Sequence, residues 1–133
     1  SAPAERRAAR FGDAWLGLFL EPRHVLAKRE QLAELAAAAG RPTPAVALAL
    51  FCNVGEGRGV HDEAKTYLEG AYGIPYEKTE RYTAVGTVEQ VAEKLGALVD
   101  AGVEGFQLMP AARDCVGQYE PLAEAIALVR AGR

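Results

Sequence analysis

Polar side chains that could do chemistry follow the apolar runs of this sequence. Glu21 follows the first run, Asn53 lies near the end of the second, and Arg113 follows the third. In a parallel α/β sheet or barrel, ligand-binding groups come from the carboxyl ends of strands and from the loops that follow. These positions are therefore the places where a site is expected.

Each of the three residues also has a structural interpretation. Glu21 could act as an acid or base, but we favour a carboxylate at a helix start, where the helix dipole stabilises it. Asn53 could bind a ligand or could equally cap the turn into the next loop. Arg113 could pair with a phosphate or carboxylate, although an exposed loop arginine is the default interpretation.

A glycine-rich segment, Gly55-Glu56-Gly57-Arg58-Gly59, suggests a phosphate-binding loop after the second run. The dinucleotide-binding fingerprint requires its third glycine to open a helix. We expect the next helix to begin at Glu63, after residues 60–62, so a mobile loop is the favoured interpretation. His61 beside Asp62 resembles an acid–base pair, but adjacent residues rarely face each other, and we predict that His61 lies at a helix start.

No metal-ligand spacing, nucleophile elbow or Cys–His pattern stands out. Any demanding chemistry is therefore assigned to a cofactor.

Three strand–helix units position these residues. Strands are predicted at 14–20, 45–54 and 103–109, and helices at 22–39, 87–101 and 117–131. Thr87 and Gln90 form a capping-box pattern at one helix start, and Gly40 and Gly102 can end helices. The continuous apolar run 45–54 suits a strand covered on both faces of a parallel sheet. A buried helix is the alternative, which the preceding prolines and the following glycines disfavour.

Segment 62–84 carries four tyrosines and is predicted to be a partly helical excursion. Its aromatic rings could line a substrate cavity, or they could form a small satellite core, which we prefer slightly. The tyrosines are Tyr67, Tyr72, Tyr76 and Tyr82.

Composition indicates an ordinary globular domain without a nucleic-acid-binding surface, since half of the 133 residues are hydrophobic and the net charge is −3. No apolar stretch reaches the ~18 residues that a membrane span needs. Residues 1–10 are charged and helix-like rather than a signal peptide. Cys52 and Cys115 are interpreted as buried or incidental thiols, which favours a cytoplasmic location.

A family resemblance adds to this interpretation. Residues 1–15, SAPAERRAARFGDAW, resemble the Gly-Gly-Ser-x-x…Arg-Ala-Ala-Arg-x-Gly-Asp-Gly-Trp signature of luciferase-like monooxygenases, with Ala14 in place of the usual glycine. Residues 38–42, 85–91 and 100–103 resemble later segments of that family in the same order.

The resemblance implies a (β/α)8 TIM barrel that uses reduced FMN or a deazaflavin coenzyme to oxidise or reduce a small organic substrate. Residues 1–133 would form the C-terminal part of that single barrel domain, from the helix after strand five to strand eight and its helix. A closed barrel takes ~250 residues, so this part is incomplete alone. No catalytic residue can be carried over. Ser1 and Ala2 match the family's phosphate-binding turn and are the predicted cofactor-binding residues.

Three functional accounts follow. The favoured one is the C-terminal fragment of a flavin- or deazaflavin-dependent luciferase-like oxidoreductase, inactive alone and completed by the N-terminal half of the barrel or by a second chain in a homo- or hetero-oligomer. The second is a non-catalytic partial barrel that binds a flavin or dimerises. The third is a structural or regulatory remnant without a ligand.

Overall fold

The computed structural model describes residues 1–133. The chain divides into two compact units, Ser1–Ala49 with Leu98–Gln107, and Leu50–Ala97 with Leu108–Arg133. Each unit therefore takes residues from strands β2 (Ala45–Val54) and β4 (Gly105–Pro110) and from helix α5 (Val88–Ala101).

The first unit also contains helix α1 (Ala2–Phe11), strand β1 (Ala14–Leu18) and helix α2 (Pro22–Ala38). Strand β1 pairs in parallel with the start of β2, from Ala14↔Ala45 to Leu18↔Ala49. The amide of Glu104 donates to the carbonyl of Val46 at 2.8 Å, which ties the entry of β4 to the same strand. Parallel pairing is thus confirmed for the strands predicted at 14–20 and 45–54.

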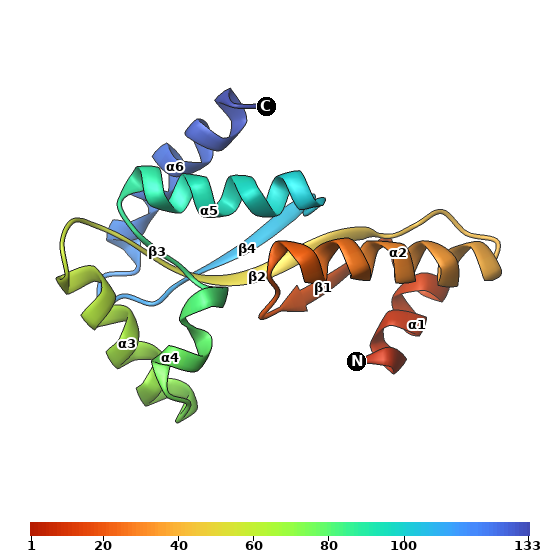
Figure 1. Cartoon of the computed structure of the whole chain (residues 1–133), viewed down its shortest axis with the longest axis horizontal. Helices are drawn as coiled ribbons and strands as arrows, with labels where there is room; N and C mark the ends of the chain where they lie inside the picture. The colour runs from red at the N-terminus through yellow and green to blue at the C-terminus, as the bar shows by residue number, and fades with distance from the viewer. The chain divides into compact units, whose positions relative to one another are not determined.

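Helix α1 packs against α2 within this unit (Figure 1). Glu5 is 1% exposed, and its Oε1 atom accepts a hydrogen bond from Nζ of Lys28 on α2 at 2.5 Å. A buried carboxylate is costly unless a charge pairs with it. This pair therefore fixes the face that α1 turns toward α2 and neutralises the only acidic residue in the first turn of α1.

Strand β1 ends earlier than predicted, at Leu18 rather than residue 20. The cause is local, because Phe19 has a φ of 57° and so leaves the extended conformation. Helix α2 then begins after Glu21 and ends as predicted at Gly40, whose φ is 66°. The Arg41 amide donates to the Ala36 carbonyl at 2.9 Å, as in a Schellman motif.

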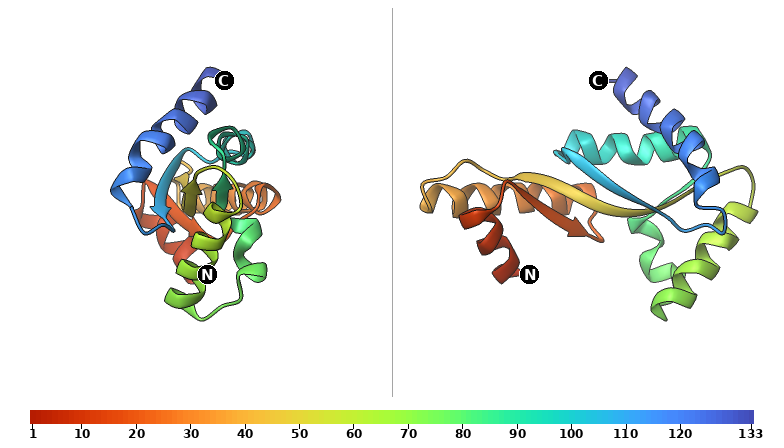
Figure 2. Two further views of the ribbon diagram at one scale, coloured as in Figure 1. Left: turned by 90° about the vertical axis from the view of Figure 1, so that its left-hand side faces the viewer. Right: turned by 180° about the vertical axis from the view of Figure 1, so that it is seen from behind.

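The second unit holds helices α3 (Gly59–Tyr72), α4 (Tyr76–Thr79) and α6 (Tyr119–Ala131) and strand β3 (Ala84–Gly86). Two 3₁₀ turns, Glu80–Tyr82 and Val116–Gln118, join these elements. The short α4 lies beside α3, in the green part of the ribbon (Figure 2). The excursion over 62–84 is therefore partly helical, as the sequence predicts.

Strand β3 was not among the predicted strands. It pairs in parallel with the end of β2, from Cys52↔Ala84 to Val54↔Gly86. The helix that follows begins as predicted, because the Thr87 amide donates to Gln90 Oε1 at 3.0 Å and the Gln90 amide to Thr87 Oγ1 at 3.2 Å. The capping box is thus confirmed.

Strand β2 is buried from Leu48 to Val54, which confirms a strand covered on both faces. Burial raises the pKa of the Cys52 thiol to about 12, so this thiol stays protonated and inert. Cys115, in contrast, is exposed. None of the helices is both long and apolar enough to cross a bilayer.

One face of β1 is open, because Leu16 and Leu18 are 55% and 45% exposed while Trp15 on the opposite face is 8% exposed. The strand pairs only with β2, so its other edge is also unpaired. Open apolar edge strands promote association. We therefore expect residues 1–133 alone to form dimers or aggregates in size-exclusion chromatography with light scattering.

A double substitution, Leu16→Ser with Leu18→Ser, should shift the population toward monomer, while Leu128→Ser on α6, also an exposed leucine, should not. A monodisperse monomer of the unsubstituted chain with a cooperative thermal transition would contradict this expectation.

Candidate functional site

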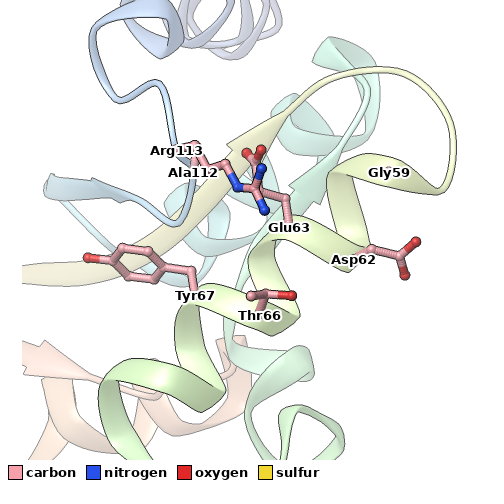
Figure 3. Close-up of a pocket in the computed structure, with 7 residues that line it drawn as sticks. All are labelled: Gly59, Asp62, Glu63, Thr66, Tyr67, Ala112 and Arg113. Carbon is pink, nitrogen blue, oxygen red and sulfur yellow. The ribbon is translucent and has the colours of Figure 1, made fainter.

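A cleft of about 470 Å³ lies in the second unit (Figure 3). Its volume falls within the range of small-molecule sites. Helix α3 forms one wall, and the residues that directly follow β4 form the other. The cleft thus sits at the carboxyl ends of β2 and β4, where parallel α/β folds bind ligands. The lining residues are Gly59, Asp62, Glu63, Thr66, Tyr67, Ala112 and Arg113.

The prediction that residues 60–62 precede the helix is wrong, because α3 begins at Gly59. The amides of His61 and Asp62 both donate to the carbonyl of Arg58 at 3.1 Å, which closes the first turn. Val60, Ala64 and Leu68 are buried at a spacing of four residues, and this periodicity was the overlooked signal. Gly59, the third glycine of this segment, therefore does open a helix. Only residues 55–58 separate that helix from β2.

Asn53, at the end of β2, is 2% exposed and links this strand to α3. Its side-chain amide donates to the Val60 carbonyl at 3.1 Å and to Glu63 Oε1 at 3.0 Å. A buried amide keeps such partners because losing them would leave polar groups unsatisfied. Asn53 thus sets where the carboxylate of Glu63 lies, and the capping interpretation is the one that these contacts favour.

Arg113 is exposed and follows the buried pair Ala111 and Ala112. The Ala111 amide donates to the Cys52 carbonyl at 2.8 Å, so the main chain just before Arg113 is tied to β2. Figure 3 shows Arg113 and Glu63 directed toward each other, whereas Asp62 points away from both. The structure therefore brings together two of the predicted candidate positions, the end of β2 and Arg113.

Tyr67 belongs to both interpretations of the tyrosine cluster. Its ring lies 6.3 Å from that of Phe51, which also meets Tyr72 edge-on at 5.5 Å. Tyr67 is nevertheless 41% exposed and lines the cleft, while Tyr76 is 6% exposed. The excursion thus forms a satellite aromatic cluster, and one member of that cluster faces the cleft.

The predicted His61 position is confirmed, in the first turn of α3. His61 and Asp62 line a second groove of about 690 Å³ together with Arg58, Glu80 and residues of the Thr87 turn.

Glu21 lies directly before α2, where its amide donates to His24 Nδ1 at 3.2 Å and its carboxylate pairs with Arg23 at 3.0 Å. This is the helix-start role that the sequence favours. Ser1 and Ala2 are exposed at the start of α1, with no side-chain cap from Ser1. No group of three or more His, Cys, Asp or Glu residues is placed to hold a metal ion.

We expect Asn53→Ala to lower the free energy of unfolding by ~1–3 kcal/mol, because it leaves the Val60 carbonyl and Glu63 without their donor. Urea denaturation of the full-length protein measures this change. Asn53→Asp keeps the side-chain size but sets a second carboxylate against Glu63, so it should destabilise at pH 7 more than at pH 4. An unchanged urea midpoint for Asn53→Ala would contradict the assigned role.

No protein-family model matches the sequence, and no curated protein matches it. Among solved structures, an F420-dependent secondary alcohol dehydrogenase in complex with an F420–acetone adduct matches 95% of the chain with a TM-score of 0.75 at 17% identity. Riboflavin lyase with modified FMN and its substrate riboflavin matches 99% with a TM-score of 0.69 at 13% identity.

EDTA monooxygenase from Chelativorans sp. BNC1 also matches 99% of the chain, with a TM-score of 0.67 at 14% identity. The chain covers 46%, 42% and 45% of these three structures, so it spans less than half of their length. The fold that the sequence resemblance implies, part of a (β/α)8 barrel, is therefore confirmed for this chain.

Proposed function

We propose that the protein is a flavin- or deazaflavin-dependent oxidoreductase, a monooxygenase or a related enzyme, that acts on a small organic substrate. Residues 1–133 contribute the C-terminal part of its single barrel domain. The observation that carries this proposal is the fold match over 95–99% of the chain to enzymes whose names include F420 or whose structures contain modified FMN. FMN or the deazaflavin coenzyme would supply the redox chemistry.

The contribution of this chain is to position and discriminate the substrate. The cleft at the ends of β2 and β4 offers a carboxylate on Glu63, a guanidinium on Arg113 and the ring of Tyr67. We propose that these three side chains recognise the substrate by charge and shape. The reactive ring requires contacts from several further strand ends around a barrel mouth.

Ser1 and Ala2 are the residues proposed to hold the cofactor phosphate. The first amides of α1 have no carbonyl partner within the helix, and the dipole there favours an anion. Glu5, the one acidic residue of that turn, is neutralised by Lys28. The first turn of α3 is less suitable, because Asp62 lies there and no cation pairs with its carboxylate.

The partner proposed for this chain is the N-terminal half of the barrel, in the same polypeptide or in a second chain of a homo- or hetero-oligomer. The open face of β1 supports this proposal, because Leu16 and Leu18 need a cover. The thiols of Cys52 and Cys115 are both free, which fits a cytoplasmic enzyme. A non-catalytic partial barrel that binds flavin or dimerises is the alternative, and the mass of the native gene product compared with 14.2 kDa separates the two.

Reconstitution tests the proposal. Residues 1–133 are mixed with an N-terminal half-barrel from the same gene, and FMN or the deazaflavin coenzyme is added. The mixture should bind the cofactor in a redox-active form, which the absorbance and fluorescence of the ring system measure. Neither part alone should bind the cofactor, because the strand ends of half a barrel cannot enclose the ring system of the cofactor. Tight binding by residues 1–133 alone would favour the non-catalytic binder instead.

The phosphate-binding role predicts a specific order of effects in the full-length protein. Ser1→Ala should weaken binding of FMN or the deazaflavin several-fold, because it removes one hydroxyl donor from the phosphate site. Arg58→Ala, in the glycine-rich segment, should leave the dissociation constant within twofold. Fluorescence titration measures both, and the reverse order would overturn the assignment of Ser1 and Ala2.

A further inference from the structure

Two opposite charges face each other across the cleft without pairing. Glu63 on α3 and Arg113 after β4 are directed toward each other (Figure 3), yet no ion pair of 4.0 Å or less joins them. Arg113 is exposed, and its guanidinium makes no other ion pair or hydrogen bond. The cleft therefore holds a free cation on one wall and a carboxylate on the other.

The Glu63 carboxylate is held in place, which distinguishes it from a solvated surface group. The buried amide of Asn53 donates to its Oε1 atom at 3.0 Å. That bond engages one carboxylate oxygen and leaves the second to accept from a ligand. Because Asn53 is 2% exposed at the end of a central strand, the carboxylate is preorganised rather than free to turn away.

This arrangement selects against ligands with one charge or none. An uncharged ligand would displace water from both groups without replacing the lost hydrogen bonds, which costs free energy at each group. A ligand with a single charge would satisfy one wall and leave the other unpaired. The complementary ligand is therefore dipolar, with a cationic or donor end at Glu63 and an anionic end at Arg113.

An ammonium group fits the Glu63 side better than a hydroxyl group. Tyr67 is 41% exposed and lines the cleft on the same helix, and aromatic rings attract cations. Asp62 adds a second negative charge to that turn of α3, although it points away. A planar guanidinium such as that of Arg113 binds a carboxylate through two parallel hydrogen bonds.

We infer that the cleft binds a small amino-carboxylate ligand, whose ammonium group lies at Glu63 beside Tyr67 and whose carboxylate lies at Arg113. This ligand would be the substrate of the oxidoreductase, so the role given to the ligand rests on the proposed function. The binding itself depends only on the cleft. The cleft volume of about 470 Å³ admits a ligand with a chain of several carbons.

Isothermal titration of the full-length protein with ω-amino carboxylic acids of two to six carbons tests the inference. At least one member should bind tenfold or more tightly than the alkylamine and the alkyl carboxylate of the same length. Equal or weaker binding of every amino acid in the series would overturn the inference.

Variants assign the two ends of the ligand. Arg113→Met should weaken binding of the best amino acid at least tenfold and leave binding of the matched alkylamine unchanged. Glu63→Gln, which keeps an oxygen for Asn53, should weaken both the amino acid and the amine. Glu56→Gln and Arg58→Met are the matched controls, because both side chains are exposed and neither lines this cleft. Equal losses in the controls would overturn the inference.

Titration with FMN or the deazaflavin coenzyme, measured by the fluorescence of the cofactor ring, tests the proposed function independently of this inference. Cofactor binding without amino-acid binding contradicts the inference alone. Amino-acid binding that depends on Arg113 and Glu63, without any cofactor binding, contradicts the proposed function and leaves the cleft's ligand class standing.

Discussion

The burial of strand β2 is the constraint on which the rest of the structure depends. Every peptide group in a covered strand needs a hydrogen-bond partner, and β2 finds them on β1, β3 and β4. Where the strand ends, side chains take over. Gln118 receives a bond from the Val54 amide at 2.8 Å and donates to the Val54 carbonyl at 3.1 Å. The 3₁₀ turn before α6 is thereby tied to the strand, and the same end of β2 carries Asn53.

The elements that the sequence predicts well are those with local signals. The strand at 45–54, the capping box at Thr87 and the glycine stop at Gly40 depend on residues within a few positions of each other, and all three are confirmed. Strand β3 was missed because three residues carry too little pattern, and only pairing with β2, some thirty positions earlier, makes it a strand. The early end of β1 was missed because nothing in the sequence marks Phe19 as left-handed.

The start of α3 shows how a correct rule can give a wrong result. Glycine is a poor helix former, so the segment up to Gly59 suggested a loop, and the helix was expected four residues later. Burial of Val60 and the bond from Asn53 to its carbonyl override that propensity. Asn53, Arg113 and the tyrosine cluster were named as candidates from the sequence, and Arg113 and Tyr67 line the cleft, whereas Glu63 was not among the candidates. Its position in the cleft follows from a helix start that local propensity had misplaced.

The cleft and the predicted phosphate site differ in the charge of the ligand that each can bind. At α1 the acidic residue of the first turn is cancelled by Lys28, which leaves the helix dipole available to an anion. At α3 no cation pairs with the carboxylates of Asp62 and Glu63, and the positive group of the cleft comes from a different segment, at Arg113. The first arrangement suits a phosphate, and the second suits a ligand with charges at two ends. A phosphate bound at the first site and a dipolar ligand bound at the second would therefore use different donors and acceptors of this chain.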